Sequence, residues 1–435
     1  MVKEIILNYS QEILLTTFLI INIFYMISFN KKGYHVFLIF SYFSLILTNF
    51  ILKSEGFLYL FDIGTFLILY PFYLTQNKEE FSISNFFIYA HLLSLHLILK
   101  TESLIIFFIS LELLSFVFYI LIGLESKKFK DLSPLIRYFV IGSLSSLFLL
   151  FSLILLYTKT QTLSYKAFTL FEKNDKLYLL SFQLFIFSLG FKILFIPFQF
   201  FMPDVFEKIS IPYLTLISLT PKAGILIFLY KIKFYLPEIT FPLSFFAIIT
   251  ILLSNLAGIY ENRIKRVLAY SSISHSAFLL FSILLPDPAS KNVLLYYLII
   301  YFIMKGGILI SLTYFIQGKE DIEFEKFKGL FFTDKIISIS IFLFIISLSS
   351  FPPSGGFFAK FYLLYELFKT GYKKEVLILI LLTILSFGYY IKFLNYFFLE
   401  PGKLREKNYS KFFEFFTLSL SVISLFGFIF IKFFI

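Results

Sequence analysis

Long runs of apolar residues, separated by short charged stretches, fill almost the whole chain. A membrane-spanning helix needs about 20 consecutive apolar residues, and the runs divide into about fourteen segments of that kind. The segments with clear bounds lie at about 11–30, 34–52, 57–74, 84–99, 103–124, 133–157, 211–234, 293–315, 376–398 and 412–431. Little chain remains for a water-exposed domain. The pattern therefore predicts an all-α polytopic membrane protein.

Two further apolar segments are interrupted by residues that break helices. The twelfth, from about Ile336 to Phe368, contains the run Pro352-Pro353-Ser354-Gly355-Gly356. The seventh, which follows a charged loop ending near Lys176, is interrupted at Ile196-Pro197. Proline removes a backbone donor and glycine resists ordering, so both breaks stop a helix. Freed backbone groups at membrane depth need protein or water to satisfy them, so each break predicts a polar path.

The two breaks fall at corresponding places in two halves of the chain. Each is the fourth helix of a five-helix set, helices four to eight and helices nine to thirteen. Such a pattern indicates repeated transporter architecture with an ion site at the break, and a repeat with an odd number of helices is inverted. The predicted units are residues 1–77 with three helices, the repeats 78–236 and 237–399, and residues 400–435 with the last helix. Helix nine is expected to end near Tyr260, and helix ten to begin after Arg263-Ile264-Lys265-Arg266.

The distribution of basic residues predicts an orientation. Loops that follow odd-numbered helices carry more Lys and Arg than the other loops, which places them inside the cell and both termini outside. The first apolar run follows Lys3 and Glu4 and lacks a small-residue cleavage site, so we expect a retained helix instead of a removed signal.

Composition narrows the function classes. With 435 residues, 59% hydrophobic and 15% charged, the chain fits no soluble class. The formal charge of +11 sits mainly in loops, which favours contact with lipid headgroups over nucleic-acid binding. The chain has no cysteine, which excludes a cysteine-ligated iron–sulfur cluster, a thioether-attached haem and a disulfide. None of the four histidines is spaced from a carboxylate as zinc or di-iron ligands are, so we expect no metal site.

Four lysines fall near the middle of apolar segments: Lys192, Lys222, Lys305 and Lys360. A charge at bilayer centre costs at least about 2.5 kcal/mol, so its presence points to a partner, a water cavity or a function. The alternative is snorkelling, in which the side chain reaches the interface. Lys392 lies nearer a helix end, where that alternative is strong. Lys305 has no break nearby and either functions or pairs locally.

Glu112 stands alone in an apolar helix and predicts a lysine partner. A carboxylate favours the neighbouring ammonium and burial disfavours it, so such a lysine can take up and release a proton when a nearby charge moves. The alternative is a permanent ion pair that only fixes helix packing. His275 is either a proton relay or a packed, hydrogen-bonded residue. His91 and His96 are weaker candidates for a proton relay than His275. Asp62 is either a helix cap or a polar packing contact.

Five stretches, in order along most of the chain, resemble one known family. They are Leu111-Glu112-Leu113-Leu114-Ser115, Pro197-Phe198 through Met202-Pro203-Asp204-Val205, Thr220-Pro221-Lys222-Ala223, Arg266 through His275, and Phe351-Pro352-Pro353 through Phe361-Tyr362. The family comprises the antiporter-like membrane subunits of respiratory complex I, and the chain is most similar to the type called subunit N of NADH-quinone oxidoreductase. Subunit M usually has glutamate where this chain has Lys360, and subunit L continues into a long lateral helix.

The resemblance implies a fourteen-helix fold with two inverted five-helix repeats. It implies that Glu112 and Lys192 form the input pair, that Lys222 is the central relay and that Lys360 is the exit-side proton site. His275, Lys305 and Lys392 are further candidate relays. No cofactor is expected in this chain; FMN, iron–sulfur clusters and quinone are expected in partner subunits. The implied partners are the M-type and small K- and J-type subunits of the membrane arm, in the plasma membrane of a prokaryote.

The chain departs from the family pattern in three places. Gln199 replaces a histidine that often follows the seventh-helix break, Arg137 replaces a lysine, and Lys305 is unusual. Because glutamine does not titrate, a relay at Gln199 needs water. Two other functions remain open from the sequence. One is a subunit of a multisubunit cation/proton antiporter or membrane-bound hydrogenase, and the other is a structural spacer in a membrane arm.

Overall fold

The computed structural model describes residues 13–18, 62, 64, 78–129, 131–169, 175–235, 240–313, 323–399 and 411–433. This part of the chain is helical nearly throughout, and extended backbone pairs there only in the isolated bridges Ser103–Ser164 and Arg263–Glu323. The predicted all-α class is therefore confirmed. The predicted helices at about 11–30, 34–52 and 57–74 lie almost wholly outside the described residues.

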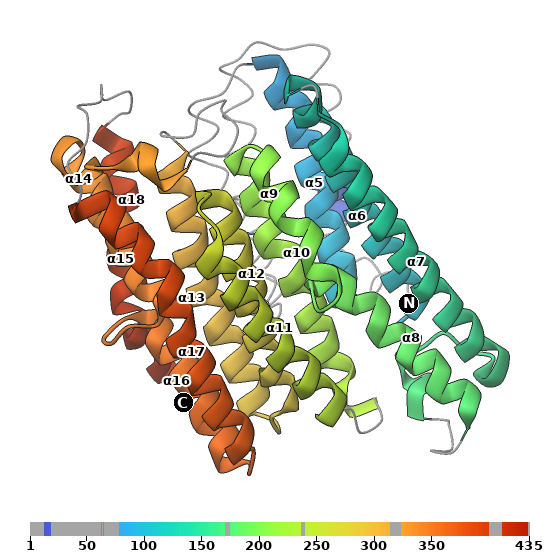
Figure 1. Cartoon of the computed structure of the whole chain (residues 1–435). Helices are drawn as coiled ribbons and strands as arrows, with labels where there is room; N and C mark the ends of the chain where they lie inside the picture. Colours follow the sequence, from blue (N-terminus) through green and yellow to red (C-terminus); the bar gives the residue numbers. More distant parts are fainter. Residues whose placement is uncertain are drawn as a thin grey trace.

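The first group of helices runs along one side of the bundle (Figure 1). It comprises α5 (Lys78–Lys100), α6 (Leu104–Phe129), α7 (Ser133–Thr160), α8 (Lys176–Ile193), α9 (Met202–Lys208) and α10 (Ile211–Ile232). Short 3₁₀ segments lie at Tyr165–Thr169, Phe198–Phe201 and Lys233–Tyr235. Asp175 caps α8 by accepting from the Leu177 N–H at 2.9 Å, and this hydrogen bond lowers the pKa of Asp175.

The second group fills the middle and the other side of the bundle (Figure 1). Its helices are α11 (Thr240–Tyr260), α12 (Ile264–Leu280), α13 (Ala289–Leu312), α14 (Leu330–Thr333), α15 (Lys335–Ser349), α16 (Gly355–Lys369), α17 (Lys373–Leu394) and α18 (Lys411–Phe426). Short 3₁₀ segments lie at Phe281–Leu284, Phe324–Phe327 and Gly427–Phe433, and a π-helical turn lies at Asn395–Leu399.

One predicted boundary is wrong. Helix α12 begins at Ile264, inside the basic run that was expected to precede it. Cations at a helix N-terminus oppose the helix dipole, which is why the run looked like a loop. In the structure Arg263 contacts Glu207, and Arg266 donates to Glu261 at 2.7 Å, so nearby carboxylates compensate that charge.

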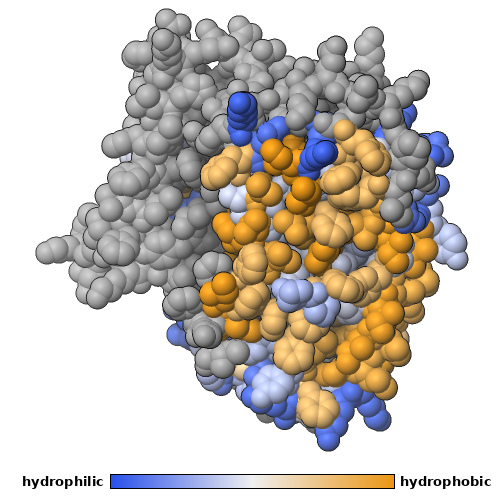
Figure 2. All heavy atoms as spheres, turned by 90° about the vertical axis from the view of Figure 1, so that its left-hand side faces the viewer, coloured by the Kyte–Doolittle hydropathy of each residue, from blue (hydrophilic) through white to orange (hydrophobic). Residues whose placement is uncertain are grey.

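Eight helices in the described part of the chain are long and apolar enough to cross a membrane. They lie at Leu104–Leu124, Ser133–Thr160, Lys176–Lys208, Ile211–Tyr235, Leu243–Tyr260, Ile264–Leu284, Ala289–Leu312 and Lys373–Phe398. Figure 2 shows a broad apolar band between hydrophilic ends on one side of the molecule. The protein is therefore a multi-pass membrane protein.

The spans differ in how deeply they are buried. In the most apolar 18-residue stretch of α10, 100% of the residues are buried, and in those of α12 and α13 the share is 89%. By contrast, only 39% and 33% of the residues are buried in the most apolar 18-residue stretches of α7 and α17. Helices α10, α12 and α13 thus form the protected centre, and a polar group on them is surrounded by protein instead of lipid.

Both predicted helix breaks are confirmed. Leu194 caps the end of helix α8 and Ser350 caps the end of helix α15, each in the left-handed backbone conformation. After the first break, the Ile196 N–H donates to Thr250 of α11 at 3.1 Å. After the second, the Gly356 N–H donates to the Ser347 hydroxyl at 3.1 Å. Side chains from other helical segments therefore satisfy backbone groups that the breaks release.

Candidate functional site

Glu112 and Lys192 meet at the end of α8, where the helix breaks. Lys192 Nζ lies 3.8 Å from Glu112 Oε1, and the two side chains are 6% and 35% exposed. Lys192 also donates to the Ser115 hydroxyl, which in turn donates to the Leu111 carbonyl at 2.8 Å. The structure thus gives Glu112 the lysine partner predicted for it. The ammonium is enclosed, and the carboxylate is open to the surroundings of the protein.

Ser146 completes this pair from a third helix. Its hydroxyl, on α7, donates to Glu112 Oε1. Helix α6 supplies both Glu112 and Ser115, which lie three residues apart on one face. The site therefore depends on α6, α7 and α8 packing together, and the two serines hold the charged groups in position.

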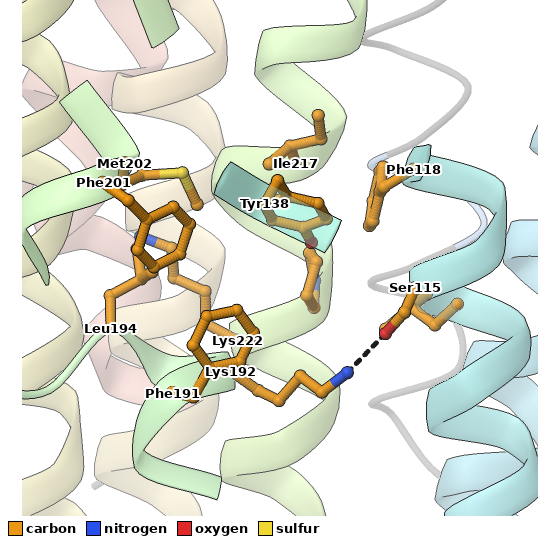
Figure 3. Close-up of a pocket in the computed structure, with 12 residues that line it drawn as sticks. Ser115, Phe118, Tyr138, Phe191, Lys192, Leu194, Phe201, Met202, Ile217 and Lys222 are labelled. Carbon is orange, nitrogen blue, oxygen red and sulfur yellow. Dashed lines mark hydrogen bonds between the residues drawn. The ribbon is translucent and has the colours of Figure 1, made fainter. Parts of the chain in front are cut away.

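A small cavity joins Lys192 to Lys222. Its volume is about 20 Å³, and about 10–15 Å³ suffices for one water molecule. Figure 3 shows Lys192 directed toward Ser115, with Lys222 on the neighbouring helix. Aromatic and apolar side chains complete the lining, among them Phe118, Tyr138, Phe191, Phe201, Met202 and Ile217. The cavity has room for one water molecule, and its polar lining includes Ser115, Lys192 and Lys222.

Lys222 sits at the centre of the bundle, directly after Pro221 inside α10, and is 2% exposed. Its ammonium donates to the Ser272 carbonyl at 3.0 Å and to the Ser272 hydroxyl at 2.6 Å. That hydroxyl also shares a 2.7 Å hydrogen bond with Tyr301 of α13. Lys222 is therefore connected to the second group of helices through hydroxyl groups.

His275 belongs to a neighbouring polar cluster on α12. Its Nδ1 shares a 3.0 Å hydrogen bond with Tyr297, and its Nε2 lies 3.5 Å from the Tyr390 hydroxyl. Tyr390 also shares a 2.7 Å hydrogen bond with Ser271. His275 is both buried and hydrogen-bonded, so its geometry fits a relay and also fits packing, the two alternatives that the sequence left open.

Lys305 and Lys360 end in different surroundings. Lys305 is fully buried and donates to the Leu268 carbonyl. The Nζ of Lys360, which is 4% exposed, lies 4.3 Å from the centroid of the Phe278 ring. Among the described residues, neither lysine forms an ion pair with a carboxylate, and the same holds for Lys222. The four mid-span lysines contact groups inside the protein, so the snorkelling alternative is wrong for them.

Lys392 lies apart from this line, at the end of α17. It donates to the Glu261 carbonyl at 2.9 Å and to Asn262 Oδ1 at 3.3 Å, in the turn before α12. Gln199 is 1% exposed, and neither polar atom of its amide has a hydrogen-bond partner within the described part of the protein. Arg137, which stands where the family often has a lysine, pairs with Asp204, and its side chain is 54% exposed.

An ion-pair network that the sequence reasoning missed lies at one end of the bundle. Arg266 Nη1 donates to Asp204 at 2.6 Å and to Glu207 at 3.1 Å. Arg263 also contacts Glu207. The network joins α9, in the first group of helices, to α12, in the second. Its sequence signal was the basic run from Arg263 to Arg266 at the start of α12.

No group of three His, Cys, Asp or Glu side chains in the described residues is placed to hold a metal ion. The arrangement instead offers a series of hydroxyl, imidazole and ammonium groups. Each of these can give up or accept a hydrogen-bonded proton. Such a series is suited to moving protons between buried positions.

Proteins of a known family are similar to this chain in sequence. The family model described as NADH:quinone oxidoreductase/Mrp antiporter, transmembrane, matches residues 101–386. NADH-quinone oxidoreductase subunit N 1 of Thermodesulfovibrio yellowstonii is 31% identical over 358 residues, which are 80% of this chain and 77% of that protein. Subunit N of Helicobacter hepaticus is 29% identical over 369 residues, covering 80% of this chain and 74% of that protein.

Solved structures share the fold. A chain of respiratory complex I from Thermus thermophilus matches with a TM-score of 0.83 at 20% identity, covering 97% of this chain and 98% of that one. A chain of the Mrp complex from a Dietzia species matches with a TM-score of 0.72 at 17% identity, covering 86% and 80%. With the match of the family model over most of the described helices, these likenesses lead to one conclusion. The chain belongs to the NADH:quinone oxidoreductase/Mrp antiporter transmembrane family.

Proposed function

We propose that this chain is an N-type subunit in the membrane arm of an NADH-quinone oxidoreductase, and that it translocates protons without redox chemistry of its own. The names of its curated relatives support the complex. The observation that carries the mechanism is the Glu112–Lys192 pair at a helix break, with Lys222 on the same cavity. In this proposal the chain contributes to an enzyme through proton movement, and electron transfer takes place in its partners.

The proposed path begins at Glu112, whose carboxylate is open to the surroundings of the protein. While Glu112 is charged, it stabilises the Lys192 ammonium; when that charge is lost or a neighbouring charge moves, the buried ammonium becomes less stable. The proton then passes through cavity water to Lys222. The break separates the Lys192 end of α8 from α9.

From Lys222 the path continues through the Ser272 and Tyr301 hydroxyls into the second group of helices. Lys305 and His275 are the proposed relays there, and Lys360 is the proposed exit-side site. Lys392 is the least supported relay, because it contacts the turn before α12 instead of another member of the path. At Gln199 a bound water would take the place of a titrating side chain.

The proposed architecture has fourteen spans and two inverted five-helix repeats. The units are residues 1–77, 78–236, 237–399 and 400–435. The equivalence of the two breaks supports the repeat, because α8 and α15 each end in a left-handed residue, Leu194 and Ser350, before a second helical piece. In each repeat a proposed proton-carrying lysine lies on one of the two pieces flanking the break, Lys192 in the first and Lys360 in the second.

In the assembly, FMN, iron–sulfur clusters and quinone belong to partner subunits. The proposed neighbours are the antiporter-like M-type subunit and the small K- and J-type subunits, within the lipid bilayer of a prokaryotic plasma membrane. Both termini face outside. The alternative of a multisubunit cation/proton antiporter or a membrane-bound hydrogenase has weaker support. The family model covers both classes, but the relatives named above are NADH-quinone oxidoreductase subunits, and the solved Mrp complex is similar at only 17% identity.

The test is to isolate the native assembly and then replace the input pair. Co-purification of flavin and iron–sulfur subunits is expected; their absence together with sodium-dependent proton exchange would favour the antiporter. In the assembled complex, Glu112→Gln and Lys192→Ala should depress proton translocation and coupled quinone reduction. Lys159→Met, which removes a lysine that is 44% exposed at the end of α7, is the matched control. Normal pumping in both site variants would reject the mechanism.

A further inference from the structure

Helix α5 carries two buried histidines that the proposed path does not use. His91 is 1% exposed and His96 is 0% exposed. In each ring Nε2 has a polar partner, whereas Nδ1 is buried and has none within the described part of the chain. A buried polar atom without a partner is costly, so two on one helix call for a physical explanation.

Thr220 is the partner of His91 Nε2. The Thr220 hydroxyl has one proton and lies 2.9 Å from the Leu216 carbonyl and 2.7 Å from His91 Nε2. When the hydroxyl donates to Leu216, the contact with His91 uses a proton on Nε2, and Nδ1 is an open acceptor inside the protein.

The same reasoning applies to His96. Its Nε2 lies 3.0 Å from Asp62 Oδ1, and both side chains are fully buried. A carboxylate accepts, so the proton is on Nε2 and Nδ1 is again an open acceptor.

His91 lies directly behind the cavity that joins the two lysines. Its ring packs edge-on against Phe118 with the centroids 5.1 Å apart, and Phe118 lines the cavity (Figure 3). One aromatic ring thus separates His91 from the cavity on which Lys192 and Lys222 lie.

The charged groups on the elements around α5 are few. Helix α10 brings Lys222 and, near the end of α5, Lys231, which donates to the Leu99 carbonyl. Helix α6 brings Glu112 within its span. Asp62 lies against His96. Asp62 is therefore the carboxylate in contact with a histidine of α5, and Lys222 is the ammonium on the helix that carries Thr220.

We propose that His91 is a second proton acceptor of the Lys222 site, and that the His96–Asp62 pair on the same helix is the next proton site of this branch. The proposal deepens the proposed function and rests on it. In the transfer, an N–H bond of the Lys222 ammonium breaks and an Nδ1–H bond forms on His91, with water carrying the proton between them. The two histidines are five residues apart, about 7.5 Å along the helix axis, a gap that water must bridge.

Glutamine substitutions separate titration from packing. In His91→Gln and His96→Gln an amide N–H stands close to the former Nε2, so donation to Thr220 or Asp62 can persist while titration is lost. In the purified whole complex in sealed vesicles, each variant should lower the protons moved per electron pair at least about twofold. The pH profile of that yield should also change. Asp62→Asn should act in the same direction as His96→Gln.

The wild-type complex offers a readout that requires no variant. With ring-¹⁵N-labelled histidine, an infrared difference spectrum on turnover should contain an imidazolium band, and His91→Gln should reduce that band. Absence of the band in wild type would overturn this branch alone. The branch would also be overturned if both glutamine variants kept a normal proton yield and pH profile while Glu112→Gln lowered the yield. If Glu112→Gln also leaves the yield unchanged, the proposed function fails and the branch fails with it.

Discussion

At the residue scale, the buried charges could be predicted, but the groups that hold them could not. A lysine or glutamate in an apolar run is conspicuous because of its cost, and Glu112, Lys192 and Lys222 all proved to be parts of one site. Their partners are ordinary serines and tyrosines. Ser146 and Tyr301 come from other helices, and no spacing in the sequence indicates which hydroxyl will face which lysine.

Ser115 provides a test at this scale. In Ser115→Ala the Lys192 ammonium loses its hydroxyl acceptor, a hydrogen bond worth about 1.5–3 kcal/mol when one partner is charged. The charged form of Lys192 becomes less stable, so proton translocation should fall severalfold while the complex still assembles.

The conservative variant serves as the control for that prediction. Ser115→Thr keeps a hydroxyl at the same position and should retain most of the wild-type proton yield, measured as vesicle acidification per NADH oxidised. Equal yields in the alanine variant and the wild type would show that Ser115 is not needed to position Lys192.

At the element scale, the breaks in the helices were predictable and one helix start was not. Proline and glycine act locally, so the break at Ile196-Pro197 and the run from Pro352 to Gly356 stop their helices wherever they lie. The start of α12 depends on Glu261, which directly follows α11, and on Glu207, which is 56 residues from Arg263. A local pattern cannot include the compensation by Glu207.

Gly356 tests the second break. A Cβ atom built at this position would lie 1.8 Å from the Ser347 carbonyl oxygen, a distance that forces the α15 and α16 pieces apart. We expect Gly356→Ala to destabilise the fold by at least about 2 kcal/mol and to reduce the amount of assembled complex. Gly123→Ala is the control, since its Cβ would meet Leu135 at an ordinary 3.5 Å. Normal assembly of Gly356→Ala would contradict the packing described for this break.

At the scale of the whole molecule, hydropathy predicted a helical membrane protein but not which helices are central. Helix α10 is completely enclosed, whereas α17 exposes large apolar side chains such as Leu377, Leu381 and Ile384. Both helices are strongly apolar in sequence, so hydropathy alone does not separate contact with lipid from contact with protein. The distinction comes from the packing of the whole bundle.

Orientation is a further property of the whole molecule and is easily measured, because the chain has no cysteine. We expect a cysteine introduced at Lys166, near the end of α7 opposite Arg137, to react with an impermeant maleimide on intact cells. A cysteine at Tyr260, which is 83% exposed at the end of α11, should react only after permeabilisation. The opposite pattern would show that the termini face inside.

The central claim is that buried ammonium groups of this chain carry protons while the electrons move elsewhere. The most direct measurement is the number of protons translocated per NADH oxidised by the complete complex in sealed vesicles, with Lys192, Lys222 and Lys360 all replaced by methionine. The account predicts an assembled complex with a clearly lower proton yield than wild type. An assembled complex with the full wild-type yield would contradict the account and make the chain a structural spacer.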